Sequence, residues 1–245
     1  THHAQYYVGK NAVVAIVGAV TRAQAESIAK RAVGKLPEGT AAPALAEIQP
    51  LKTEQTVKID YPSQQTHILV GQQGMRRGDP DYFSLYVGNH ILGGSGLVSR
   101  LAEEIREKRG LSYSQYSYFS PMRLNGPYTL GLQTRNNQVA QALTLLNDLL
   151  KTFITQGPTE EELKAAKQNI TGSFPLRISS NRKIVEYLAM IGFYDLPLDY
   201  LDTFNAKIEA VTSQQIREAF QRRINPEKLI TVIAGGKTST NGEGS

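Results

Sequence analysis

The stretch Ile91–Tyr113 constrains this chain most, because it combines a glycine turn, a short amphipathic helix and a glycine stop. Five apolar residues recur at helical spacing and predict one buried stripe: Leu97, Val98, Leu101, Ala102 and Ile105. Gly110 is the residue type that ends helices in the left-handed conformation. The run Leu111–Phe119 then alternates and is rich in aromatic residues, which is typical of a strand. We therefore predict a helix, a tight turn and a strand that folds back from it.

Charged residues cover the rest of this helix. Glu104 and Lys108 stand four positions apart, a spacing that favours an ion pair. Arg106 lies in the last helical turn and Tyr113 opens the following strand, so the two side chains can point into the same space. A structural interpretation also fits, in which Arg106 pairs with Glu103 and Tyr113 is an amphipathic residue at a sheet edge. On spacing alone, the structural interpretation is favoured.

Composition excludes several classes of protein. The chain has 245 residues and no cysteine, which excludes disulfides and thiolate chemistry. No apolar run approaches the length that spans a membrane. The net charge is +5, but the basic residues occur as scattered pairs without interleaved aromatic residues. We therefore predict no membrane span in this chain and no nucleic-acid partner.

The first 52 residues divide into two parts. The apolar run Ala12–Val17 predicts a buried strand, and Thr21 has capping-box spacing with Gln24 ahead of a helix at 22–34. The inner face of that helix is predicted to carry Ala25, Ile28, Ala29 and Ala32 or Val33. Residues 37–52 contain three prolines and many alanines, so we interpret them as a linker at a domain boundary.

Strands and helices follow from residue 53 onward. Strands are predicted at 55–61, 66–71, 111–119 and 127–133, the last two joined through Asn125-Gly126, a hairpin signal. One helix begins at Asp79-Pro80, and further helices are predicted at 139–153, 159–172, 181–191, 198–208 and from Thr212. Capping boxes are predicted for two of these helices, between Thr159 and Glu162 and between Thr212 and Gln215. A last strand spans 229–234, and the polar, glycine-rich residues 237–245 predict a disordered tail.

Two segments repeat one pattern, a short polar lead, an apolar strand and a glycine: Tyr7–Gly18 and Ile224–Gly235. If this is the closing strand of a duplicated unit, residues 1–36 hold the closing strand and helix of a preceding domain, and residues 53–236 form the next domain. A chance match of two buried strands explains the pattern equally well.

Metal ligands and nucleophiles are not indicated by any motif. The histidines are His2, His3, His67 and His90, and none forms H-E-x-x-H or H-x-x-E-H. We interpret them as surface or core residues, with a site remnant or a tag remnant as alternatives for the first two. The run Gly93–Gly96 precedes a helix as phosphate loops do, but it lacks a Walker lysine, and a tight turn is favoured.

The segment Asn89–Ser114 closely resembles the second-domain signature of the pitrilysin and mitochondrial-processing-peptidase family. These are the inverzincin metallopeptidases and their zinc-free partner subunits. The resemblance extends to Gly235 and is most specific between Arg106 and Tyr113. Further segments fit the same pattern: Asp79–Asp81, Thr159–Leu163, and Tyr6–Gly18 with Leu36-Pro37.

The resemblance implies an α+β fold, a two-layer α/β half-domain whose mixed, mostly antiparallel sheet is covered by helices. Family enzymes bind zinc in a first unit through H-x-x-E-H and a distal glutamate. A later unit contributes an arginine and a tyrosine that hold the peptide substrate, and by position these are Arg106 and Tyr113.

Because this chain lacks the zinc motif, the resemblance implies the zinc-free, substrate-binding half of a metalloendopeptidase, inactive alone. We expect the chain to bind no cofactor itself. Zinc is expected in a partner domain or subunit, with which the chain would hydrolyse peptides. The alternative within the same family is a catalytically inert scaffold or core subunit.

Overall fold

The computed structural model describes residues 1–236, which fall into two compact units. The helical unit comprises residues 1–47 and 170–206, and the sheet unit comprises residues 48–169 and the chain from 207 onward. The predicted tail at 237–245 lies outside the described residues. The predicted division into residues 1–36, a linker at 37–52 and a domain at 53–236 stays a prediction.

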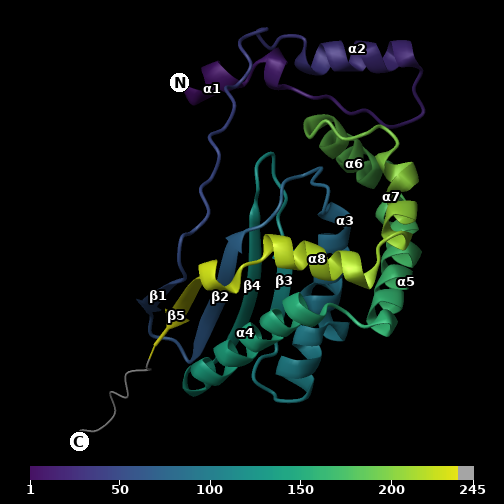
Figure 1. Cartoon of the computed structure of the whole chain (residues 1–245). Coiled ribbons are helices and arrows are strands. Elements are labelled where there is room, and N and C mark those ends of the chain that lie inside the picture. The colour runs from purple at the N-terminus through teal and green to yellow at the C-terminus, as the bar shows by residue number, and fades with distance from the viewer. Residues whose placement is uncertain (237–245) are drawn as a thin grey trace, which may run out of the picture. The chain divides into compact units, whose positions relative to one another are not determined.

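A five-stranded sheet forms the centre of the sheet unit (Figure 1). The last strand, β5 (Ile230–Gly235), runs parallel to β1 (Gln55–Asp60) and antiparallel to β2 (Gln65–Gln73). The remaining strand pairs are antiparallel. The predicted mixed, mostly antiparallel sheet is therefore confirmed. In spatial order the strands are β1 (Gln55–Asp60), β5 (Ile230–Gly235), β2 (Gln65–Gln73), β4 (Pro127–Arg135) and β3 (Gln115–Phe119).

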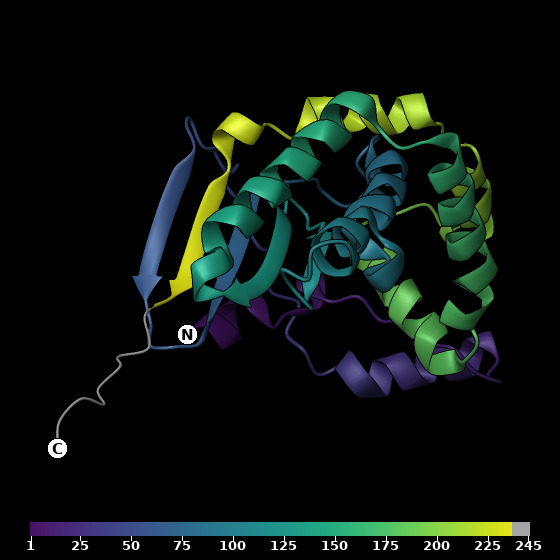
Figure 2. The ribbon, with the colours of Figure 1, turned by 90° about the horizontal axis from the view of Figure 1, so that it is seen from below.

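Two helices cover one face of this sheet (Figures 1 and 2). Helix α4 (Val139–Gln156) packs across β2 and β4, and α8 (Ser213–Arg223) packs against α4 and against α3 (Tyr82–Asn89). Alternate strand residues on the covered face are buried, among them Ile68, Val70 and Leu130. Alternation between a buried and a solvated face is typical of a sheet with helices on one side. The predicted α+β, two-layer architecture is confirmed.

An aromatic cluster joins these helices to the sheet. The ring of Phe220 on α8 lies 4.9 Å from the ring of Phe153 on α4 and 6.4 Å from the ring of Tyr128 on β4, in edge-to-face geometry. All three side chains are fully buried. Such pairs add to the stabilisation that burial of their apolar area provides, so this cluster fixes α4 and α8 over the sheet.

Helix α3 (Tyr82–Asn89) begins later than the predicted Asp79-Pro80 start, and its N-cap is Asp81. The carboxylate of Asp79 accepts a hydrogen bond from the Asp81 amide at 2.9 Å and pairs with Arg223 at 2.6 Å. These contacts hold Asp79 in a turn ahead of the helix. The helix continues as a π-helical turn, η2 (His90–Gly94).

Two other predicted boundaries differ from the structure. Helix α5 (Glu160–Arg177) passes the predicted end at residue 172 and contains Pro175 in its last turn, so this proline does not end the helix although it removes one backbone donor. Strand β3 begins at Gln115 and not at Leu111, since the preceding residues form the turn described below. The remaining helices of the second half are α6 (Asn181–Phe193) and α7 (Tyr200–Glu209).

The helical unit contains α1 (His2–Tyr6) and α2 (Arg22–Val33). The capping box between Thr21 and Gln24 is present as predicted, but no residue of α2 is buried, so its predicted inner face is only partly covered. The predicted strand at 12–17 is wrong, because the segment is extended without strand pairing and Val13 is 48% exposed. A strand needs hydrogen-bonded neighbours, and within residues 1–236 this segment has none.

Candidate functional site

The helix that carries Arg106 is short and partly π-helical. It begins at Arg100 and continues as η4 (Ala102–Glu107), in which the Lys108 amide donates to the Glu103 carbonyl five residues earlier at 2.9 Å. π-Helical turns are rare and often occur at functional sites. The predicted stripe is confirmed for Leu101, Ala102 and Ile105, which are all fully buried.

The same prediction is wrong for Leu97 and Val98, which are 62% and 82% exposed. They lie in a separate 3₁₀ turn, η3 (Gly96–Val98), which begins with Gly96 at φ +67°. Helical spacing therefore does not continue backward from Leu101. Neither apolar residue of this 3₁₀ turn is therefore buried against the core ahead of Leu101.

The turn after the helix is fixed by backbone hydrogen bonds. Gly110 is left-handed at φ +59°, as predicted, and its amide donates to the Arg106 carbonyl at 2.9 Å. The Leu111 amide donates to the Ile105 carbonyl at 2.9 Å, and the buried Thr134 hydroxyl of β4 donates to the Leu111 carbonyl at 2.6 Å. The segment between Arg106 and Tyr113 is therefore tied to both the helix and the sheet.

Arg106 and Tyr113 lie together at this turn. The Arg106 Cζ atom lies 5.8 Å from the centroid of the Tyr113 ring, within the range of a cation–π contact. Tyr113 is 80% exposed, whereas the Arg106 side chain is 33% exposed. The Arg106 Nε atom lies 3.4 Å from the Glu107 carboxylate, and the alternative partner Glu103 pairs with Lys108. The predicted proximity is thus confirmed, while the role of the pair toward a substrate stays a prediction.

A small cleft of about 120 Å³ adjoins Tyr113 where β2 begins and β4 ends. Its lining combines the turn residues with polar side chains of β2, β4 and the start of α4, among them Gln65, Gln133, Arg135 and Gln138. Amide and guanidinium groups of this kind can bind the carbonyl and amide groups of an extended peptide. The exposed phenol therefore borders a polar recess.

A second group of charges surrounds the end of the helix. Lys108 and Arg109 each lie 2.6 Å from an oxygen of the Glu104 carboxylate, so the predicted pair between Glu104 and Lys108 is confirmed. Hydrogen bonds from Lys108 and Arg109 lower the pKa of Glu104, and hydrogen bonds to Glu104 and Glu103 raise the pKa of Lys108. These charges compensate one another and leave Arg106 as the cation that faces Tyr113.

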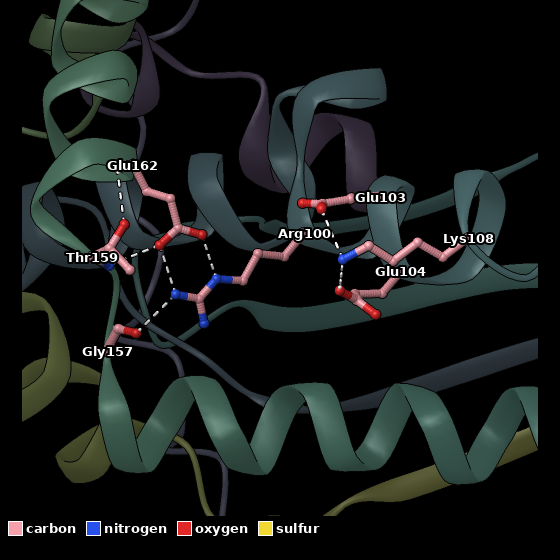
Figure 3. A network of polar contacts seen from close by, with 7 residues as sticks. All are labelled: Arg100, Glu103, Glu104, Lys108, Gly157, Thr159 and Glu162. Atoms are coloured by element: carbon pink, nitrogen blue, oxygen red, sulfur yellow. Dashed lines mark hydrogen bonds and ion pairs between the residues drawn. The ribbon is translucent and has the colours of Figure 1, made fainter.

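The start of the helix is held by an ion pair that spacing did not predict (Figure 3). The Arg100 guanidinium contacts both oxygens of Glu162 at 2.5 and 2.6 Å and donates to the Gly157 carbonyl at 3.1 Å. Glu162 also accepts from the Thr159 amide at 2.7 Å, which confirms the predicted capping box at the start of α5. The sequence pattern predicted the contact of Glu162 with Thr159, but nothing in that pattern indicated Arg100 as a second, distant partner.

The described residues do not fit a zinc site. Within residues 1–236, no three His, Cys, Asp or Glu side chains gather as ligands of one metal ion would. His67 is exposed on β2 and His90 begins η2, so they lie on separate elements. Gly93 packs against β3, since a Cβ there would meet the Ser117 amide at 2.7 Å. This contact accounts for that glycine by close packing.

The family model for the peptidase M16 inactive domain matches residues 1–170 of the chain. The chain belongs to this family. A crystal structure of a peptidase M16 inactive domain from Pseudomonas fluorescens is 39% identical, with a TM-score of 0.91 over 96% of this chain and 56% of that chain. The uncharacterized zinc protease YmxG of Bacillus subtilis is 36% identical over 118 residues, or 48% of this chain and 29% of that protein. The non-peptidase homolog YmxG of Helicobacter pylori is 31% identical over 150 residues, or 60% of this chain and 34% of that protein.

Membership in the M16 family confirms the resemblance stated from the sequence, including the inactive type of domain. The matched part of the chain spans about a third of the length of these curated relatives, which are therefore larger than the region compared. Within residues 1–236, no helix is both long and apolar enough to cross a membrane. The family is that of an inactive peptidase domain, and the fold matches a solved example of that domain.

Proposed function

We propose that this chain is the substrate-holding, zinc-free half of an M16 metalloendopeptidase, and that Arg106 and Tyr113 contact the peptide. Hydrolysis would require a zinc-bearing domain or subunit as partner, since the described residues of this chain fit no zinc site. The proposal is supported by two comparisons: the match to the inactive-domain family model and the Bacillus relative, which is described as a zinc protease.

The chemistry of amide hydrolysis explains why an arginine and a tyrosine suit this role. The peptide carbonyl oxygen gains negative charge as the tetrahedral intermediate forms, and hydrogen-bond donors aimed at that oxygen lower the barrier. The Arg106 guanidinium and the Tyr113 phenol are two such donors. In a site from which water is excluded, their interaction with the oxygen becomes stronger than in solution.

The observation that carries the proposal is the cation–π contact between Arg106 and Tyr113 at an anchored turn. The Gly110 turn restrains the backbone on both sides, and the ring that Arg106 covers is 80% exposed. Within residues 1–236 nothing forms a hydrogen bond with the Tyr113 hydroxyl, although its ring is held. A donor that is positioned and still available suits a substrate contact better than a structural one.

The second candidate function is an inert scaffold of the same family. It is favoured by the Helicobacter relative, which is described as a non-peptidase homolog. In that case Arg106 and Tyr113 would form a surface stack with no substrate to contact. The two functions make different predictions for the complete complex.

Metal analysis and a cleavage assay separate them. The tag-free chain alone should bind less than stoichiometric zinc and cleave no peptide, because its four histidines lie at unsuitable spacing. Addition of the zinc-bearing domain or subunit encoded with it should give proteolysis that a chelator abolishes. Stoichiometric zinc and chelator-sensitive cleavage by the chain alone would contradict the proposal, and a zinc-loaded complex that cleaves nothing would favour the scaffold.

A further inference from the structure

We propose that the ion pair between Arg100 and Glu162 is a positioning device for Arg106 and Tyr113. It fixes the start of the helix that carries Arg106 and, through the Gly110 turn, the orientation of Tyr113. The inference rests on the proposed function and adds two positioning residues that act through others and contact no substrate themselves.

The Arg100 guanidinium has its partners on three sides (Figure 3). Two parallel contacts to Glu162 fix its plane, and a third hydrogen bond reaches the Gly157 carbonyl. Its Cζ atom lies 5.0 Å from the centroid of the buried Phe153 ring on α4. Bidentate pairing fixes both distance and angle, which a single lysine contact would not do. The side chain is therefore held in one orientation.

The site that receives Arg100 is itself rigid. Gly157 ends α4 in the left-handed region at φ +73°, and Glu162 closes the capping box of α5 with Thr159. The carboxylate of Glu162 thus serves two functions, as cap of α5 and as partner of Arg100. The pair connects the Arg106 helix to the turn between α4 and α5. This turn follows directly on α4, whose Phe153 ring contacts Phe220 of α8.

The Arg106 helix needs such an anchor at its start. Leu97 and Val98 ahead of it are exposed, so no apolar contact from this turn holds the chain before Leu101. Arg100 and Arg106 are six residues apart, roughly 9 Å along a helix, so a tilt of about 6° moves Arg106 by about 1 Å. A displacement of that size can cost about 100-fold in rate when the displaced group acts on the substrate.

A comparable ion pair elsewhere in the sheet unit provides the control. Arg223 at the end of α8 contacts Asp79 at 2.6 Å and Asp81 at 2.8 Å, with Asp79 3% exposed. These contacts join α8 to the start of α3. They involve neither the Arg106 helix nor the segment from Gly110 to Tyr113. Arg223→Met therefore removes arginine–carboxylate contacts of similar length, here to two carboxylates, without touching the anchor of the Arg106 helix.

Hydrogen exchange tests the anchor without any catalysis. We expect Arg100→Met to speed amide exchange across residues 102–111 by about tenfold or more in the folded chain. Glu162→Gln, which keeps a capping oxygen, should act in the same direction, and Arg223→Met should leave the segment within about twofold of the wild type. Unchanged exchange across 102–111 in both Arg100→Met and Glu162→Gln would overturn the proposal.

Turnover of the complete complex tests whether the anchor acts through Arg106 and Tyr113. Arg100→Met should lower kcat by about 10- to 100-fold in the wild-type background. In a background that already carries Arg106→Ala and Tyr113→Phe, the same change should lower kcat less than about twofold. A purely structural role would give the same factor in both backgrounds, and that result would overturn the proposal. If the wild-type complex cleaves nothing, the proposed function is contradicted. The hydrogen-exchange result then still tests whether the Arg100–Glu162 pair anchors the helix.

Discussion

Two clusters of ion pairs hold the helix that carries Arg106, and they differ in reach and in burial (Figure 3). The Arg100 cluster joins residues 62 positions apart, with side chains 19% and 28% exposed. The Glu104 cluster lies within one turn of the helix end, and its Lys108 side chain is 51% exposed. One cluster therefore connects the helix to another part of the fold, and the other stabilises the helix locally.

The difference matters because the free energy of an ion pair depends on solvent. Exposed pairs contribute little, since water and salt screen them and both side chains lose conformational freedom. Removal of one partner from a largely buried pair leaves a charge without compensation, which is much more costly. We therefore expect the Arg100 cluster to control the position of the helix and the Glu104 cluster to adjust it slightly.

The largest effect on stability is expected for Glu162→Gln. The change removes the charge that compensates the half-buried Arg100 and should lower the free energy of unfolding at pH 7 by about 2 kcal/mol. Urea denaturation followed by circular dichroism measures it. An unchanged midpoint would mean that the two clusters do not differ in energy as their burial indicates.

The pH dependence of the same variant sharpens the comparison. Burial raises the pKa of Glu162, but the hydrogen bonds from Arg100 and Thr159 outweigh it and hold the pKa below its ordinary value of 4.5. A lowered folded-state pKa means that the stabilisation is present above pH 4.5 and is lost as the pH falls through the folded-state pKa. The difference between wild type and Glu162→Gln should therefore shrink in acid, and a difference that grows in acid would contradict this assignment.

A smaller effect is expected for Glu104→Gln. The variant removes the partner of Lys108 and Arg109, whose side chains are about half exposed. It should shift the unfolding midpoint several-fold less than Glu162→Gln, and the shift should decrease as salt is added, because salt screens exposed charges. A shift as large as that of Glu162→Gln and independent of salt would remove the distinction between the clusters.

Local patterns in the sequence predicted most of this region correctly. The capping boxes at Thr159 and Thr212, the Gly110 stop and the pair of Glu104 with Lys108 depend on residues a few positions apart, whose geometry the helix itself sets. The pairing of Arg100 with Glu162 depends on the fold that brings them together. No local spacing carries that information, which is why the anchor was not predicted while the contact between Arg106 and Tyr113 was.

The strand predictions show the same limit. The runs Ala12–Val17 and Leu229–Ala234 share one apolar pattern, yet only the second overlaps a strand, β5, which lies between β1 and β2. An apolar pattern is compatible with a strand, but the strand forms only where neighbouring strands supply hydrogen-bond partners. The prediction for Leu97 and Val98 failed for a related reason: they form a separate 3₁₀ turn, and the extended Ser99 separates that turn from the helix whose spacing they match.

Turnover of Tyr113→Phe in the complete, zinc-loaded complex tests the proposed substrate contact most directly. Only the hydroxyl is lost, so fold and partner binding should persist, and kcat should fall on the order of 10²- to 10³-fold. Arg106→Ala should lower it at least as much. Tyr116→Phe is the matched control, because Tyr116 is also partly exposed but lies on β3, stacked on Tyr118, and it should retain the wild-type rate. If Tyr113→Phe and Arg106→Ala both cleave peptides at the wild-type rate while circular dichroism shows an intact fold, the assigned substrate contact is wrong.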